Sequence, residues 1–340
     1  MEIEVRPALS QFVVEVSDSS HVGEARRTAF QSAEAIGMGE SDAGAVAIAV
    51  TELGTNLLKH AKTGKLVFEV LGSRVQGLRV LSLDKGPGIH DITSALEDGY
   101  STSGTSGNGL GAVKRLSTHF DIYSAHDGGT CVLADFWPKK KNPDPTGPLD
   151  LGVVSLPLRG EEVCGDGWAS RTTSDNVYLM VVDGLGHGIF ASEAAREAER
   201  IFRETDSASP SGILRDCHDA LKKTRGAAAA IAVINKEKCS LSFAGLGNIS
   251  ATLITRQGRR GIASHNGTLG HEMHKIQEFA LPWNEDGVLI MYSDGLISRW
   301  DLDTYPGIIS KHPSIVAAAL YRDFYRERDD VTVLVAKNPG

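Results

Sequence analysis

The chain has 340 residues, of which 41% are hydrophobic and 23% charged, so it is long enough to form two globular domains with ordinary cores. Its 43 acidic and 35 basic residues give a formal net charge of -8, which disfavours nucleic acid and anionic membranes as main partners. The four cysteines form no C-x-x-C pair, and neither a signal-peptide pattern nor an apolar stretch of about 18 residues occurs. These features predict a cytoplasmic protein without a zinc ribbon or a membrane span.

The first part of the chain mixes helical and strand periodicity. Strands are predicted at 11–16, 66–71, 78–84, 120–125 and 130–137. Helices are predicted at 21–38 and 41–61. The segment 99–111 is rich in Gly, Ser and Thr and is expected to form a loop.

A linker is predicted at 138–148, which holds four prolines, a run of lysines and no large apolar residue. After it, strands dominate, at 151–158, 177–183, 228–235, 240–244, 251–255, 276–280, 288–294 and 331–336. Helices are predicted at 188–204, 211–223 and 314–326. We therefore expect an α+β protein with one domain at 1–137 and a second, a layered sandwich, at 149–340.

The helix predicted at 41–61 presents two polar side chains beside its buried stripe. The stripe consists of Val46, Val50, Leu53 and Leu57. Glu52 and Asn56 are four residues apart on an adjoining face. Asn56 offers a neutral oxygen ligand suited to a hydrated Mg²⁺, and Glu52 could orient or deprotonate a nucleophile. The alternative is that both residues lie on a solvated helix edge.

Two glycine-rich turns follow. Asp84 ends an apolar strand and could accept a hydrogen bond from an exocyclic amine such as that of adenine, while Gly86 and Gly88 would let the backbone approach the ring. The loop 99–111 opens a helix, so its amides and the helix dipole suit phosphate groups. The alternatives are a plain turn and a mobile connector.

Taken in order, these motifs resemble the N, G1 and G2 boxes of the GHKL ATPase superfamily, in the branch of the anti-sigma-factor serine kinases. The resemblance covers roughly 10–137 and includes the phrase Thr-Glu-Leu-Gly-Thr-Asn. It implies a Bergerat α/β sandwich that binds Mg-ATP, with Glu52 as catalytic base and Asn56 as Mg²⁺ ligand. The implied nucleotide contacts are Asn56, Asp84, Gly86, Gly88, Gly107, Asn108, Gly109, Leu110, Gly111 and Thr130.

Acidic residues flank several predicted strands of the second domain. Asp183 and Asp294 each close an apolar strand and precede a Gly, and Asp166 also precedes a Gly. Asp329 and Asp330 open the last strand. If they converge on one rim, they repel one another and raise one another's pKa unless a hard divalent cation is present. Oxygen-only ligands favour Mg²⁺ or Mn²⁺, and two such ions could activate a water for attack on phosphate.

The order of these motifs resembles the metal-dependent protein phosphatases (PPM), in the SpoIIE-like branch, over roughly 151–337. The resemblance implies an α-β-β-α sandwich with two Mn²⁺ or Mg²⁺ ions. Asp183 would bridge them as the catalytic carboxylate, helped by the Gly184 carbonyl. Asp166 would serve the first ion, and Asp294 and Asp329 the second. Leu185 stands where many eukaryotic relatives have a His, so water is a candidate to protonate the leaving group.

Other residues near these motifs are expected to have lesser roles. Asn248 is expected to shape a turn, although a phosphate-facing role is open. His187 is expected to be structural or to face substrate, and the alternative is that it replaces the missing His as general acid. Arg159 could hold a substrate phosphate, and Cys164 is expected to be a buried spectator.

Together, the two resemblances imply a bifunctional partner-switching regulator. Its second domain would dephosphorylate phosphoserine or phosphothreonine on a STAS-type anti-anti-sigma protein, and its first would phosphorylate such a protein or sequester an anti-sigma or sigma factor. The alternatives are a first domain that only senses ATP and gates the phosphatase, and one that only binds a sigma-like factor. The sequence leaves the oligomeric state open.

Overall fold

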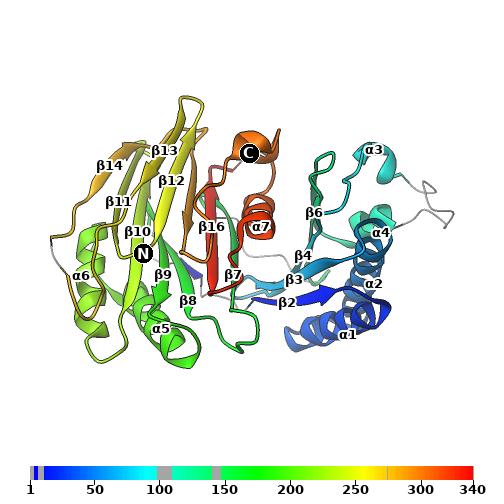
Figure 1. The fold of residues 1–340 in the computed structure, drawn as a ribbon, viewed down its shortest axis with the longest axis horizontal. Coiled ribbons are helices and arrows are strands. Elements are labelled where there is room, and N and C mark those ends of the chain that lie inside the picture. Colours follow the sequence, from blue (N-terminus) through cyan, green and yellow to red (C-terminus); the bar gives the residue numbers. More distant parts are fainter. Residues whose placement is uncertain (1–3, 7–10, 98–108, 140–146, 274, 340) are drawn as a thin grey trace. The chain divides into compact units, whose positions relative to one another are not determined.

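The computed structural model describes residues 4–6, 11–97, 109–139, 147–273 and 275–339 (Figure 1). The chain forms two compact units. The two-sheet unit consists of Met1–Ala8, Thr146–Trp300 and Asp323–Gly340, and the α/β unit consists of Leu9–Pro145 and Asp301–Arg322. The units therefore do not follow a single division at 138–148, because a segment from within 149–340 belongs to the α/β unit.

The α/β unit contains a five-stranded antiparallel sheet in the order β2-β3-β4-β6-β5, with two long helices on one face. The strands are β2 Gln11–Val16, β3 Gly64–Leu71, β4 Gly77–Leu83, β5 His119–Ser124 and β6 Thr130–Phe136. The helices are α1 Ser19–Ala35, α2 Glu40–Asn56, α3 Ile92–Ala95, α4 Gly109–Leu116 and α7 Pro313–Phe324, with a π-helical turn η1 Leu57–Ala61 and 3-10 turns η2 Leu302–Thr304 and η3 Ile308–Ser310. Apolar side chains of α1 and α2 pack against alternate residues of the strands, such as Leu66 and Phe68, and form the core.

The opposite face of this sheet is covered by residues 301–322. Lys65 and Arg79 lie on that face, because their neighbours in β3 and β4 point into the helix-covered core. The Arg79 Nη1 donates to Ser314 Oγ at 2.6 Å, and the Lys65 Nζ donates to Tyr321 Oη at 3.0 Å. The segment thus completes the α/β unit.

The two-sheet unit stacks a six-stranded sheet, β1-β8-β9-β10-β11-β14, on a five-stranded sheet, β13-β12-β15-β16-β7. The strands are β1 Glu4–Arg6, β7 Asp150–Leu156, β8 Asp166–Thr172, β9 Asn176–Gly184, β10 Ala227–Asn235, β11 Ser240–Leu246, β12 Ser250–Thr255, β13 Gly258–Ile262, β14 Phe279–Pro282, β15 Val288–Tyr292 and β16 Val331–Lys337. One core lies between the sheets and includes Val181 and Met291. A second core lies between the larger sheet and the helices α5 Ile189–Glu204 and α6 Pro210–Leu221.

The predicted α+β class is confirmed, and each predicted helix and strand has a counterpart within a few residues. The strands β1, β8 and β13 were not predicted. None of the helices in the described ranges is both long and apolar enough to cross a bilayer.

Candidate functional site

The first candidate site lies at the end of α2, where Glu52 and Asn56 project beside the N-terminus of α4. A Cβ atom placed on Gly109 would lie 3.3 Å from both Asn56 amide atoms and 3.4 Å from the Glu52 Oε2. The predicted pair and the end of the predicted phosphate loop are therefore neighbours. Gly107 and Asn108, together with the rest of 99–108, lie outside the described residues, whereas Leu110 and Gly111 belong to α4.

Asp84 follows β4 and is held by two backbone amides. Its Oδ1 accepts from Gly86 N at 2.8 Å and from Thr130 N at 3.2 Å. Burial raises the pKa of Asp84, and these two hydrogen bonds oppose the rise. Within the described residues, the Oδ2 has no hydrogen-bond partner, so it can accept from a ligand amine.

The two glycines after Asp84 have structural reasons of their own. Gly88 has φ +79, and a Cβ atom there would lie 2.1 Å from Ala125 O. A Cβ atom on Gly86 would lie 2.9 Å from Ala61 Cβ in η1. The turn is thus packed against the π-helical turn that follows Asn56, which brings the motifs of α2 and β4 together. Thr130 is buried, and its Oγ1 is 2.9 Å from Ser124 Oγ.

Arg322 of α7 also contacts this site, a contribution that the sequence did not indicate. Its Nη1 donates to the main-chain oxygen of Asp84 at 2.9 Å. A Cβ atom on Gly129, next to Thr130, would lie 2.7 Å from the same Nη1. The contact joins residues 238 positions apart, and no local motif marks it.

The second candidate site is a cluster of carboxylates in the two-sheet unit. Asp166 at the start of β8 lies opposite Asp183 near the end of β9. Burial first, and then the Asp183 charge, raise the pKa of Asp166 well above its ordinary value, while the Ser293 Oγ donates to Asp166 Oδ2 at 2.6 Å and opposes the rise. Burial, followed by the Asp294 charge, raises the pKa of Asp183 to about 7. The carboxylates are therefore close enough to repel one another.

Asn248 connects the two sheets at this cluster. It lies between β11 of the larger sheet and β12 of the smaller one, directly after Gly247 with φ +93. Its Nδ2 donates to Asp183 Oδ2 at 3.1 Å and to Asp294 Oδ2 at 2.8 Å. The sequence indicated a turn at this position, and the structure adds a direct contact with two predicted metal ligands.

The remaining predicted ligands lie around the same cluster. Burial and then the Asp294 charge raise the pKa of Asp329. Asp330 is 2% exposed, and both of its oxygens accept main-chain hydrogen bonds, from Leu158 N at 2.8 Å and from Gly165 N at 2.9 Å. Asp330 therefore fixes the backbone around the cluster. A Cβ atom on Gly184 would lie 2.1 Å from Ala191 O, so α5 approaches too closely for a side chain there.

The cluster fits hard divalent cations by the chemistry of its donors, which are carboxylate oxygens. Burial, and then the neighbouring Asp294 charge, raise the pKa of Asp183 to about 7, and a cation would offset both effects. As it stands, no group of three Asp, Glu, His or Cys side chains in the described ranges is already positioned around one ion. The Asn248 amide lies between two of the carboxylates instead.

Three other residues that the sequence analysis discussed are His187, Cys164 and Arg159. The His187 Nδ1 is 2.7 Å from Glu161 Oε1, and burial raises the pKa of the Cys164 thiol well above its ordinary value. Arg159 is exposed.

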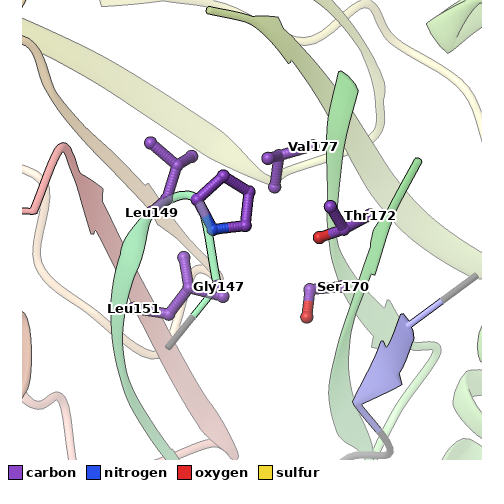
Figure 2. A pocket seen from close by; sticks show the side chains of 7 residues that line it. Gly147, Leu149, Leu151, Ser170, Thr172 and Val177 are labelled. Atoms are coloured by element: carbon purple, nitrogen blue, oxygen red, sulfur yellow. The ribbon is translucent and has the colours of Figure 1, made fainter. Parts of the chain in front are cut away.

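Figure 2 shows a small pocket at the far end of β8 from Asp166, lined by Gly147, Pro148, Leu149, Leu151, Ser170, Thr172 and Val177. Its lining has no titratable side chain, so it is separate in chemistry from the carboxylate cluster.

Two family models match the chain. Residues 5–136 match the histidine kinase-like ATPase domain, and residues 173–339 match stage II sporulation protein E (SpoIIE). The serine/threonine-protein kinase RsbT of Bacillus subtilis (strain 168) is 38% identical over 114 residues, which cover 33% of this chain and 86% of RsbT. The phosphoserine phosphatase RsbX of the same organism is 26% identical over 145 residues, which cover 42% of this chain and 73% of RsbX. A solved structure from work on the bacterial stressosome as a modular system has a TM-score of 0.53 and 26% identity, covering 56% of this chain and all of that one.

Proposed function

Because the chain belongs to the histidine kinase-like ATPase family and joins this domain to a SpoIIE phosphatase domain, we propose that both units act on STAS-domain proteins of a partner-switching system. The two-sheet unit is a PPM-type serine/threonine phosphatase domain, so the chain is an enzyme. The α/β unit is a kinase-like ATPase domain homologous to RsbT. A chain that joins these two domains has the domain composition of a partner-switching regulator.

The phosphatase centre that we propose is the carboxylate cluster. Asp183 would bridge two Mn²⁺ or Mg²⁺ ions, with the Gly184 carbonyl beside it. Asp166 would bind the first ion, and Asp294 and Asp329 the second. The observation that supports this most is the Asn248 amide held between Asp183 and Asp294, because it brings strand ends of two different sheets to one point.

Bound ions would supply Lewis-acid stabilisation of a phosphate and a water with a lowered pKa. The protein's own groups would hold and orient this centre. Asp166 is fixed by Ser293, and Asp330 fixes the main chain at Gly165. Leu185 offers no proton where related enzymes have a His, and His187 is paired with Glu161, so we propose that water protonates the leaving serine oxygen.

In the α/β unit we propose that Asp84 binds the adenine amine and that Asn56 holds the Mg²⁺ of ATP. Gly86, Gly88, Thr130 and the start of α4 would surround the nucleotide. Glu52 lies on the same side of α2 as Asn56 and faces Gly109, so it is placed to accept a proton from an attacking serine hydroxyl.

The substrate class rests on the relatives. RsbT is named as a serine/threonine-protein kinase and RsbX as a phosphoserine phosphatase, and one similar structure comes from work on the bacterial stressosome. We propose that the substrate is a STAS-domain protein of such an assembly or a STAS-type anti-anti-sigma protein, and that the setting is the cytoplasm. A sigma or anti-sigma factor is a further candidate partner.

The experiment compares the full chain with Glu52→Ala, Asp183→Asn and the double variant, using STAS-domain proteins from the same genome. Asp183→Asn should accumulate phosphoserine from labelled ATP, because phosphate removal is lost. Glu52→Ala should bind ATP yet transfer no phosphate, while still releasing phosphate from a phosphorylated STAS protein. If Asp183→Asn binds ATP and transfers nothing to any of these proteins, the α/β unit is an ATP sensor. A partner that co-purifies equally with Asn56→Ala would indicate sequestration instead.

A further inference from the structure

An exposed apolar surface begins two residues after Asp183. Leu185, Ile189 and Phe190 are 44%, 66% and 59% exposed. Large apolar side chains that are exposed singly are common, whereas several close together are a feature of protein interaction sites. The patch does not continue along α5, where the solvent-facing residues are charged: Glu193, Arg196 and Arg200.

The buried face of α5 explains why these side chains point to solvent. Ala191, Ala194, Ala195 and Ala198 are buried against the larger sheet. Ile189 and Phe190 precede this stripe on the first turn, on the side away from it. Their exposure is therefore set by the register of the helix, and burying them would require the helix to rotate out of its core.

The patch is held in place beside the carboxylate cluster. The Leu185 amide donates to Gly226 O at 3.0 Å, which fixes the turn after β9 to the start of β10. Arg225, the residue before Gly226, has its guanidinium carbon 4.9 Å from the centroid of the Phe190 ring. A Cβ atom on Gly186 would lie 3.2 Å from Arg225 Nη1. Leu185, Phe190 and Arg225 thus form one connected surface.

Arg225 gives this surface a positive charge next to a site of negative charge. It is exposed and follows two further exposed cations, Lys222 and Lys223. The Lys222 Nζ lies 2.6 Å from Asp219 Oδ1, so the charge of Lys222 is partly neutralised and less available to an anion. The stacked guanidinium of Arg225, in contrast, can still receive an anion at its edge.

We propose that Leu185, Ile189, Phe190 and Arg225 form the docking surface for the phosphoprotein substrate of the two-sheet unit. The occupant is a folded protein that presents apolar side chains beside its phosphoserine. These side chains pack on Ile189 and Phe190, and Arg225 faces the phosphate or an acidic neighbour of it. The proposal rests on the phosphatase centre at Asp183, since a phosphoserine that reaches Asp183 brings the surrounding protein surface onto the residues that follow it.

The test separates docking from chemistry by using two substrates. One is a STAS-domain protein from the same genome, phosphorylated on serine, and the other is p-nitrophenyl phosphate, which is too small to reach the patch. Ile189→Ala and Phe190→Ala should raise KM for the phosphoprotein about tenfold, as expected for an interface anchor, with kcat and hydrolysis of p-nitrophenyl phosphate retained. Ile48→Ala is the matched control, because Ile48 is also an exposed isoleucine, 54% exposed on α2.

A binding experiment keeps the proposal testable without turnover. The Asp183→Asn chain should bind the phosphoprotein, and adding Phe190→Ala or Arg225→Ala should weaken that binding about tenfold, whereas adding Ile48→Ala should not. Equal binding by all these variants would overturn the docking surface. A loss of turnover on p-nitrophenyl phosphate as large as that on the phosphoprotein would also overturn it, because the residues would then act on the centre itself. Failure of the wild-type chain to release phosphate from either substrate contradicts the phosphatase centre instead, and the binding result still decides the docking surface.

Discussion

Replacing Asp183 by asparagine should stabilise the metal-free chain while it removes phosphatase activity. In the folded metal-free protein, burial and the Asp294 charge raise the pKa of Asp183 from 3.8 to about 7. The unfolded chain releases the same proton near pH 3.8, so between these values the folded state holds a proton that the unfolded state has lost. The free energy of unfolding contributed by Asp183 therefore falls as pH rises through this window, and its loss is complete above pH 7.

The size of the effect follows from the same values. The difference between 3.8 and about 7 corresponds to roughly 4 kcal/mol at 1.36 kcal/mol per pH unit. Asp166 and Asp294 share the repulsion, so about 2 kcal/mol is the lower expectation for a single substitution. At about 2–4 °C per kcal/mol, the thermal midpoint of Asp183→Asn should exceed that of the wild type by on the order of 10 °C at pH 8. The gain should be small at pH 4.

Thermal unfolding of the full chain in chelator, at pH 4, 6 and 8, measures this difference. Asp175→Asn is the matched control, because Asp175 is exposed in the turn between β8 and β9 and its substitution should leave the midpoint unchanged. With Mn²⁺, hydrolysis of p-nitrophenyl phosphate should fall by orders of magnitude in Asp183→Asn and not in Asp175→Asn. A midpoint difference between Asp183→Asn and wild type that does not grow from pH 4 to pH 8 would refute the reasoning from burial and carboxylate repulsion.

Three further predictions concern other residues of the two sites. Asn248→Ala should lower the midpoint in chelator at pH 8, because two carboxylates lose a charge-assisted donor at a cost of about 1.5–3 kcal/mol, and an unchanged midpoint would contradict this. Asn56→Ala should weaken binding of a non-hydrolysable ATP analogue with Mg²⁺ about tenfold in titration calorimetry, whereas Glu52→Ala should bind it normally; equal affinities in all three chains would mean that this helix edge is only solvated. Arg322→Ala should weaken binding of the same analogue about fivefold through the Asp84 turn, with Arg322→Lys less affected, and unaltered affinity in Arg322→Ala would remove this arginine from the site.

Much of the fold could be predicted because apolar periodicity is a local property. The strand at Gln11–Val16 was predicted with its observed bounds, since its apolar residues are bounded by polar ones. The strand β8 was missed because it contains Ser170 and Arg171, which are buried through tertiary partners. Arg171 stacks on Tyr178 at 4.3 Å and donates to two main-chain oxygens, so its burial depends on contacts that no window of sequence contains.

The candidate sites also combine features that local sequence predicts with features that depend on tertiary contacts. Motif order was sufficient to predict that Asp166, Asp183 and Asp294 gather, because residues at strand ends meet at sheet edges. It could not predict that Asn248 binds two of them, since Gly-Leu-Gly-Asn is also an ordinary turn sequence. The sequence also could not predict which sheet α7 covers. Residues Pro313–Tyr321 are buried on every side of the helix, so the sequence shows no polar face that would indicate its orientation.

A chain with the kinase and the phosphatase activity that we propose for one serine must also control the ratio of the two activities. When both reactions run together, their net result is hydrolysis of ATP. Because the two units are joined one to one, the phosphorylated fraction of the substrate depends on the rates of the two reactions and not on the amount of the chain. A response to a signal then requires a ligand with different affinities for two states of the chain. The chain leaves the two-sheet unit after Trp300, a few residues beyond Asp294. At the end of the segment 301–322, Arg322 donates to the main-chain oxygen of Asp84, and the chain then returns to the two-sheet unit and reaches Asp329 a few residues later. Two of the proposed phosphatase ligands thus flank, in the sequence, the segment that completes the α/β unit.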